Sequence, residues 1–168
     1  MNVGMDRRRA AVGLIGVAAC ASLGTLGIVP LRFSEPADRD PELRLLGPSV
    51  QQPVGGAAIR LWARIENPNG FGLRLSQVAG DLHIEDAEAI AVDFPLGLPL
   101  VAHQDTVIPL DVSIRFDNLP RLATLARAAL TGNPLAYRMD GTFTVDAGSL
   151  GSPRFGPLTL LRGEIRVR

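Results

Sequence analysis

The stretch Ala58-Ile59-Arg60-Leu61-Trp62-Ala63-Arg64-Ile65-Glu66 alternates from Ile59 onward between an aliphatic residue and a charged residue or tryptophan. Successive side chains of a β-strand point to opposite faces of its sheet, so a period of two separates a core face from a solvent face. Here the aliphatic side chains share one face, and Trp62 shares the other with the charged residues. The stretch predicts a strand buried on one side.

The same alternation recurs along the rest of the chain. It is clear in Thr106–Asp117, in residues 135–146 and in residues 161–167, and rougher in residues 43–50, 73–84 and 89–94. Turn residues separate these stretches at the spacing that is typical of a β-sandwich. The pattern predicts about seven antiparallel strands.

Three local features refine this strand pattern. The aliphatic residues of 73–84 change parity near Ser76-Gln77, where a β-bulge would restore one buried face. Pro109 has no N–H to donate to a neighbouring strand, so its strand should lie at a sheet edge or contain a bulge. Pro95 is expected to end the strand of residues 89–94.

One segment changes to a helical period. Leu119, Leu122, Leu125, Ala126, Ala129 and Leu130 recur at steps of three and four residues. We expect Asn118 to cap the start of this helix, Pro120 to lie in its first turn and Gly132 to end it. The expected fold is an all-β sandwich with one helix crossing between two late strands.

Composition limits the function. The chain has 168 residues, with 17 basic residues, all of them arginine, balanced by 17 acidic ones. A length of this order suits one domain. Zero net charge argues against a nucleic-acid partner, which would need a positive face. A single cysteine excludes a disulfide framework and a cysteine-based zinc site.

The N-terminus has the pattern of an export signal. Arg7-Arg8-Arg9 precedes an apolar run that reaches Cys20 through Val17-Ala18-Ala19. Arginines before an apolar stretch hold that end in the cytoplasm while the rest of the chain crosses the membrane. Val17, Ala18, Ala19 and Cys20 match the bacterial lipobox, in which the cysteine is lipidated and becomes the first residue.

Two other interpretations of the N-terminus stay open. The segment from Ala10 to Leu31 is long enough for an uncleaved membrane helix. Ala19-Cys20-Ala21 also fits a simple cleavage site that would release a secreted product. All three interpretations place the folded part outside the cytoplasm, in the periplasm or the cell envelope. Prolines and charges after the apolar run indicate a tether. The predicted divisions are a signal peptide at 1–20, a tether at 21–42 and a folded domain at 43–168.

A distinctive turn closes the stretch at residues 58–66. It reads Asn67-Pro68-Asn69-Gly70, in which Pro68 stops strand pairing and the asparagines can bond to nearby backbone. The turn is preceded by Arg64-Ile65-Glu66 and followed by Leu73-Arg74-Leu75. Farther along the chain come Val107-Ile108-Pro109-Leu110, the helix at 119–130 and residues 134–141. In these residues the chain resembles the late embryogenesis abundant group 2 family. This family is also called the water stress and hypersensitive response domain, and the resemblance covers most of residues 41–168.

The resemblance implies a fold and a role. Family members resemble an immunoglobulin or fibronectin type III β-sandwich with a helix, and bacterial members are often lipoproteins. The family is associated with desiccation tolerance and supplies no catalytic residues to carry over. Asn67, Pro68 and Asn69 are therefore expected to be structural. The apolar content of this chain sets it apart from the polar, disordered late embryogenesis proteins of other groups.

A few other residues have side chains that could carry chemistry. Asp81, His83 and Glu85 alternate and could hold a cation loosely, although a solvated strand face explains them better. His103 fits a loop, while Ser149 and Ser152 lack the setting of a catalytic serine. Trp62 on the polar face indicates either an interaction patch or stacking beneath arginine side chains. We therefore expect no catalytic residue, no metal and no cofactor.

These observations favour a non-enzymatic domain that is tethered to a membrane through Cys20 and protects or contacts other molecules under water stress. Its expected partners are the membrane, through the lipid anchor, and client proteins or lipids. The alternative is a periplasmic module that holds a lipid or another apolar ligand between its sheets. A long apolar cavity would favour the second function over the first.

Overall fold

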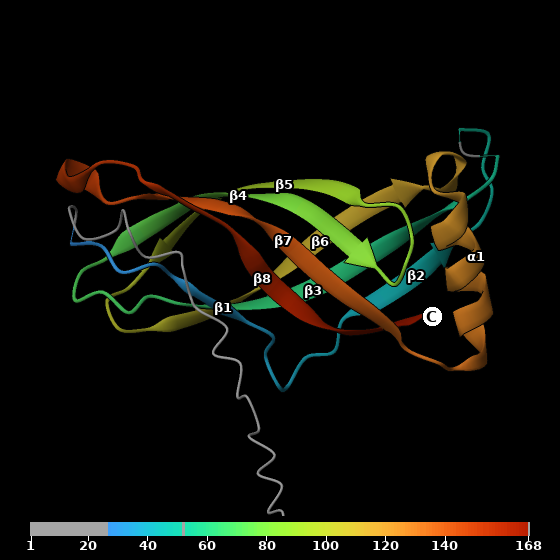
Figure 1. The fold of residues 1–168 in the computed structure, drawn as a ribbon, viewed down its shortest axis with the longest axis horizontal. Helices are drawn as coiled ribbons and strands as arrows, with labels where there is room; N and C mark the ends of the chain where they lie inside the picture. The colour runs from blue at the N-terminus through green and yellow to red at the C-terminus, as the bar shows by residue number, and fades with distance from the viewer. Residues whose placement is uncertain (1–26, 52, 168) are drawn as a thin grey trace, which may run out of the picture.

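The computed structural model describes residues 27–51 and 53–167. Eight strands carry the fold: β1 (Arg32–Ser34), β2 (Glu42–Leu46), β3 (Gly56–Glu66), β4 (Leu73–Ile84), β5 (Ile90–Leu100), β6 (Asp105–Arg115), β7 (Leu135–Asp146) and β8 (Arg154–Val167). One helix, α1 (Pro120–Ala128), connects β6 to β7 (Figure 1). Three short 3-10 turns complete the elements: η1 (Phe116–Asn118), η2 (Ala129–Thr131) and η3 (Gly148–Leu150). The prediction of a β-rich fold with one helix is confirmed.

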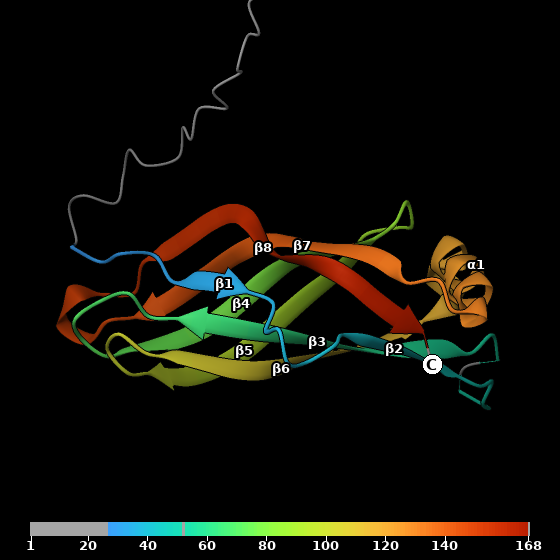
Figure 2. The same cartoon turned by 90° about the horizontal axis from the view of Figure 1, so that it is seen from below.

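The strands form an open sheet in the order β1-β3-β2-β8-β7-β4-β5, and β6 pairs with the other edge of β3. All pairings are antiparallel except the short parallel contact of β2 with β8, at Glu42↔Arg166 and Leu43↔Val167. This contact joins two groups of strands, β1, β2, β3 and β6 in one and β4, β5, β7 and β8 in the other. In the view of Figure 2, β7 and β8 form an upper layer and β3 lies in the layer below them.

Apolar side chains from both groups of strands form one core. Phe143 of β7 contacts Phe33 of β1, with ring centroids 5.0 Å apart, and stacks on Phe155 of β8 at 5.1 Å. The aliphatic row predicted for β3 is fully buried, and so is the inward row of β7, which consists of Leu135, Tyr137, Met139, Phe143 and Val145. Burial of these rows is the main favourable term that holds the groups together.

The structure contains most of the strand features that the sequence predicts. A register shift between Leu75 and Gln77 interrupts the pairing of β4 with both neighbours, which confirms the predicted bulge. Among the strands of the described residues, β6 pairs with β3 alone, which confirms the edge position expected from Pro109. Pro95 does not end its strand, because β5 continues to Leu100. β5 is an edge strand, in which alternate N–H groups face away from the sheet, and prolines are tolerated in such strands.

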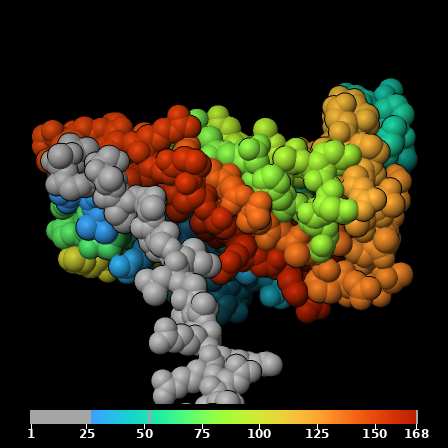
Figure 3. Space-filling model, viewed as in Figure 1, coloured from blue at the N-terminus to red at the C-terminus, as the bar shows by residue number. Residues whose placement is uncertain are grey.

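Helix α1 covers one end of the sheet, at the right of Figures 1 and 2, and buries Leu122, Ala123 and Ala126. In the space-filling view it forms a block at the right, beside the green atoms of the β4–β5 region and the face made by β7 and β8 (Figure 3). Pro120 occupies its first turn, and Gly132 follows η2 at φ 107°, as predicted. The prediction that Asn118 caps the helix is wrong: Asn118 ends η1, and the carboxylate of Glu88 accepts a hydrogen bond from the backbone N–H of Arg121.

The predicted tether contributes to the fold. β1 lies within it, and Ile28 and Leu31 before β1 are buried. The prediction that folded structure begins near Leu43 is therefore wrong, and the strand count is eight because β1 was missed. β2 is also shorter than the predicted stretch at 43–50.

Ile28 and Leu31 are core residues, so any membrane helix would have to end before them. Val17, Ala18, Ala19 and Cys20 lie outside the described residues. In the part of the chain that the structure describes, no helix is long and apolar enough to cross a membrane.

Candidate functional site: the asparagine corner

The turn after β3 contains two buried asparagine side chains with several hydrogen bonds. We call Asn67, Pro68 and Asn69 the asparagine corner. Asn67 is 0% and Asn69 4% exposed, and they are the buried polar residues among those described. A buried amide side chain is tolerated when its hydrogen-bonding groups have partners. The partners of the two asparagines therefore show what the corner does.

Asn67 connects two loops. Its Nδ2 donates to the carbonyl oxygens of Phe71 at 2.9 Å, Val101 at 3.3 Å and Leu100 at 3.4 Å. Its backbone N–H donates to the carbonyl of Gln104 at 2.9 Å. The side chain thus joins its own turn to the β5–β6 loop. Its Oδ1 accepts from the backbone N and from Nδ2 of Asn69, each at 3.0 Å.

Asn69 fastens the beginning of the described chain. Its Nδ2 donates to the carbonyl of Val29 at 2.8 Å, and its Oδ1 accepts from the backbone N–H of Val29 at 2.7 Å. The amide thereby pairs with Val29 as a neighbouring strand would. Its own carbonyl accepts from the N–H of His103. The corner holds three segments together, around Val29, Phe71 and Val101.

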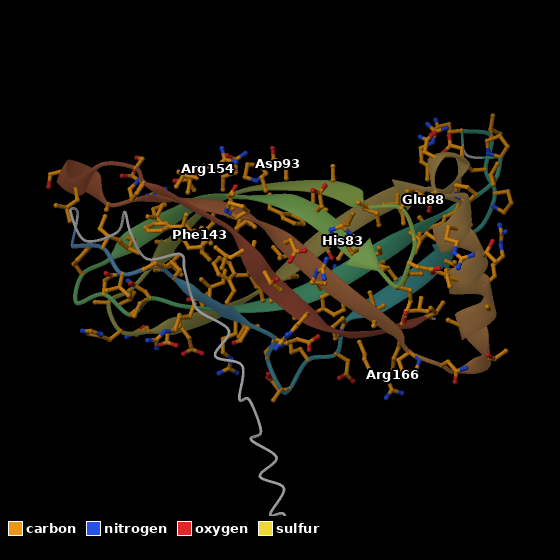
Figure 4. The ribbon with its side chains drawn as sticks, in the orientation of Figure 1. His83, Glu88, Asp93, Phe143, Arg154 and Arg166 are labelled. Carbon is orange, nitrogen blue, oxygen red and sulfur yellow. The ribbon has the colours of Figure 1, made fainter. Side chains whose placement is uncertain are left out.

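The predicted chemical candidates are not brought together. Oε1 of Glu85 accepts a hydrogen bond from the backbone N–H of Ala136 at 2.5 Å, and Nε2 of His83 lies 3.9 Å from Oδ2 of Asp140. Within residues 27–51 and 53–167, no group of three histidine, cysteine or acidic side chains is placed to hold a metal ion. Figure 4 shows His83 on β4, well away from Arg166 on β8. His103 lies in the loop after β5, and Ser149 and Ser152 are exposed in the β7–β8 turn.

Trp62 stacks beneath arginine. The guanidinium carbon of Arg39 lies 4.5 Å from the centroid of the Trp62 ring, and that of Arg60 lies 6.0 Å away. Arg39 comes from the stretch that was predicted to be a tether. The stacking interpretation of Trp62 is therefore confirmed. Arg39, the nearer of its two arginine partners, does not lie on the strand of Trp62 and could not be inferred from the strand pattern.

Charged side chains on the outer faces pair with one another. Arg60 of β3 makes two hydrogen bonds to Asp111 of β6, at 2.6 and 3.0 Å. These hydrogen bonds hold the pKa of the Asp111 carboxyl below its usual value. A hydrogen bond from the Thr159 hydroxyl, followed by one from Arg138, does the same to the pKa of Asp140. Exposed pairs of this kind contribute little to stability and leave the surface polar.

A second polar contact joins the segment after β1 to the β7–β8 pair. The sequence did not indicate it. The Tyr137 hydroxyl donates to Oε1 of Glu35 at 2.8 Å. The Glu35 carboxylate lies directly over Gly163, where a Cβ atom would come within 2.7 Å of the carboxyl carbon. Glu35, Tyr137 and Gly163, together the Glu35 seam, thus hold the segment after β1 against the sheet.

Burial of its hydroxyl raises the pKa of Tyr137 well above its usual value, and the hydrogen bond to Glu35 raises it further. A group whose pKa rises on folding contributes stability that is complete below its unfolded pKa, which is about 10 for tyrosine. The free energy of unfolding should therefore fall as the pH rises above about 10. Tyr137 is the one tyrosine and the chain contains no lysine, so tyrosinate absorbance reports this group alone. We expect that absorbance to rise together with unfolding, and Tyr137→Phe to remove the alkaline loss. Titration of the folded protein near pH 10 would contradict this.

Replacement of Gly163 by alanine should push the Glu35 carboxylate away from Tyr137. Because the displaced group is the end of a flexible side chain, the expected cost is that of one hydrogen bond, about 1 kcal/mol. Tyr137→Phe should cost a similar amount, and the double variant little more than either single one, since both remove the same contact. Denaturant unfolding of the three variants measures this, and fully additive losses would show that the contact is not shared.

The fold and the corner define a class: a β-rich domain with one helix, whose buried polar motif bonds to its own backbone. The chain belongs to the late embryogenesis abundant group 2 family, because the family model described as late embryogenesis abundant protein matches residues 63–158, more than half of the chain. The matched range includes the asparagine corner and α1. The resemblance inferred from the sequence is thereby confirmed.

Solved structures give more distant similarities. A crystal structure from Archaeoglobus fulgidus is 12% identical and covers 77% of this chain and 97% of its own, with a TM-score of 0.43. A solution structure from Arabidopsis thaliana is 16% identical, over 83% of this chain and 79% of its own, at 0.47. A solution structure described as a late embryogenesis abundant protein is 19% identical, and the match covers 76% of this chain and 71% of that one, with a TM-score of 0.48. The comparison with curated proteins gives no match.

Proposed function

We propose that the chain is a non-enzymatic domain, tethered to a membrane on its extracytoplasmic side, that protects other molecules under water stress. One observation supports this most directly. The buried polar side chains of the described residues, Asn67 and Asn69, bond to the backbone of the fold and to each other. A motif used in this way maintains a shape and leaves function to the surface. Membership of the late embryogenesis abundant family associates that surface with water stress.

The fold we propose for this role is the immunoglobulin or fibronectin type III type of sandwich. The contact between Phe33 and Phe143 supports it, because it joins the two groups of strands across the core. A core of this kind, closed by aliphatic and aromatic side chains, stays folded without a ligand. Such a domain would be structured before water is lost.

Protection is tested by drying an unrelated enzyme with and without the full chain and measuring the activity recovered on rehydration. We expect greater recovery than with an equal mass of an unrelated folded protein. The far-ultraviolet circular dichroism of the chain should be the same before drying and after rehydration. Recovery no better than with the control protein would reject the protective role.

The anchor we propose is a lipid on Cys20, with Val17, Ala18 and Ala19 completing the lipobox. The early start of the fold agrees with a short connection, because the buried residue Ile28 follows Cys20 closely. Intact mass of protein recovered from native membranes tests the anchor. A diacylglyceryl group on Cys20, with loss of residues 1–19, is the expected result. Retention of Arg7–Arg9 would select an uncleaved helix, and a soluble product that begins at Ser22 would select secretion.

A ligand-holding role is the second candidate. A hollow of about 440 Å³ lies between β1 and β8, lined by Phe33–Glu35 and Thr159–Arg162. The Glu35 seam lies at one end of this hollow, and Phe143 fills the space beneath β1. These contacts favour a closed interior. Native mass spectrometry of protein taken from membranes tests this directly: a stoichiometric acyl ligand would favour the carrier, and its absence the protective domain.

A further inference from the structure

We propose that the end of the domain built around the asparagine corner lies against the lipid bilayer and places Val29, Val101 and Leu150 in its interfacial region. This inference rests on the proposed function, because the N-terminal anchor is what brings the bilayer to the domain. The partner is a lipid surface, recognised through apolar contact. Four features of the chain support the inference.

The first feature is exposure. Val29 is 48%, Val101 59% and Leu150 43% exposed, so three aliphatic side chains protrude into solvent. Val29 and Val101 are held in place by the asparagine corner, through Asn69 and Asn67 respectively. The corner thus presents two apolar side chains on a rigid base. Exposed aliphatic residues are common, so exposure alone does not choose between the two ends of the domain, and the choice rests on the features that follow. The α1 end also has exposed aliphatic side chains, at Leu46, Val50, Val54 and Leu130.

The second feature is the location that Val29, Val101 and Leu150 share. Glu66, at the end of β3, pairs with Arg32 of β1 and with Asp105 of β6. In the other group of strands, Leu73 pairs with Leu100, and Arg74 with Asp146. The segments at 27–31, 67–72, 101–104 and 147–153 therefore extend from the same end of the sheet (Figure 1, left). Helix α1 lies at the opposite end.

The third feature is the reach of the chain. Cys20 and Ile28 are eight residue steps apart. Eight steps of a fully extended chain span at most about 29 Å. β8 has 14 residues and runs between the two ends of the domain. At about 3.3 Å per residue this length is on the order of 40 Å. A domain turned with α1 toward the bilayer would hold Ile28 beyond the reach of an anchor at Cys20.

The fourth feature is charge. Arg32 pairs with Glu66 at 3.2 Å and Arg64 with Asp105 at 3.1 Å, so these charges neutralise each other. The other charged residues near this end leave only a small basic excess, and they are Arg74, Asp146 and Arg154. Attraction to anionic lipid would require a larger excess of basic side chains. Apolar contact with uncharged lipid, insensitive to salt, is what this end can provide. The short connection also keeps the local concentration of lipid high, so three side chains suffice for contact.

The test uses the full chain, produced with its own N-terminus in a bacterial host and reconstituted into phosphatidylcholine vesicles. Cys20 is the one native cysteine, so lipidation leaves an introduced cysteine as the free thiol. Spin labels are attached to Val101→Cys, to Leu150→Cys and, as the control, to Val50→Cys. Val50 is fully exposed in the loop beside α1. Oxygen and a water-soluble nickel chelate then measure how far each label is protected by lipid.

We expect the labels at 101 and 150 to lose accessibility to the chelate and to keep it to oxygen, with no change at high salt. The label at 50 should remain accessible to both. Equal chelate accessibility at all three sites, in protein whose mass shows the lipid on Cys20, would overturn the docking and leave the proposed anchor intact. Protection at 50 alone would show that the α1 end faces the bilayer. Protein without an anchor that stays outside the vesicles would overturn both proposals.

Discussion

Replacement of Gly80 by alanine is expected to lower the free energy of unfolding by about 3 kcal/mol, because the new methyl group would meet main chain that has no room to move. Gly80 of β4 pairs with Gly141 of β7. A Cβ atom on Gly80 would lie 2.6 Å from the Cα of Gly141 and would overlap the carbonyl oxygen of Asp140. Both contacts are backbone atoms of a paired strand.

Relief of this clash would require β4 and β7 to separate. β4 is also paired with β5, through Gly80↔Val92, and β7 is also paired with β8. Separation would therefore break hydrogen bonds at the centre of this group of strands. Gly141→Ala should be equally damaging, because its Cβ would lie 2.9 Å from the Cα of Gly80.

Denaturant unfolding followed by circular dichroism measures the effect. Gly47→Ala is the matched control, because a Cβ atom at Gly47 would meet nothing within 4 Å and Gly47 is not at positive φ. Its effect should stay within about 0.5 kcal/mol of zero. If Gly80→Ala unfolds at the same denaturant concentration as Gly47→Ala, then the close approach of β4 and β7 is not a feature of the folded protein.

Local pattern predicted the strands well where burial follows a strict period. β7 has the bounds that its alternation indicates, and β3 differs by two residues at its start. The bulge in β4 was also visible, because a change of parity is a local signal that one residue has been added. These features depend on neighbours in sequence, which is why one sequence suffices to predict them.

The errors arise where a distant segment supplies the partner. Asn118 has the chemistry of a helix cap, yet α1 receives its acceptor from Glu88, in the β4–β5 connection (Figure 4). β1 looks like a linker, since its three residues show no period, and it forms because β3 offers an edge to pair with. In the same stretch, Arg39 contacts Trp62 and Glu35 contacts Tyr137, and only the fold brings these residues together. Nothing within these segments encodes those contacts.

The asparagine corner was predictable in part. Its residues could be recognised as a turn with structural asparagines, because proline and asparagine favour that conformation. The pairing of Asn69 with Val29 spans 40 positions and was not predictable from the motif. The bonds between Asn69 and Val29 connect the asparagine corner to the segment that follows the proposed anchor. They therefore connect it to the proposed docking on lipid.

Replacement of Asn67 by alanine is expected to cost about 3 kcal/mol of unfolding free energy and to release the first described segment. The substitution leaves the carbonyls of Phe71, Leu100 and Val101 without this donor, in a site where Asn67 itself is fully buried. An unsatisfied buried polar group costs about 1–3 kcal/mol. It also removes the acceptor that positions Asn69. The clamp on Val29 should therefore loosen, although Asn69 itself is unchanged.

Two measurements distinguish this result from general destabilisation. Denaturant unfolding gives the loss of stability, and hydrogen exchange of the Val29 amide shows whether the clamp opens below the global unfolding free energy. Asn133→Ala is the matched control, since Asn133 also precedes a proline, Pro134, and is exposed. We expect the control to stay within about 0.5 kcal/mol of the unsubstituted chain. If Asn67→Ala behaves as Asn133→Ala does, or if the Val29 amide keeps its protection, the corner does not fasten the start of the fold, and the base on which Val29 and Val101 are presented to the bilayer is lost.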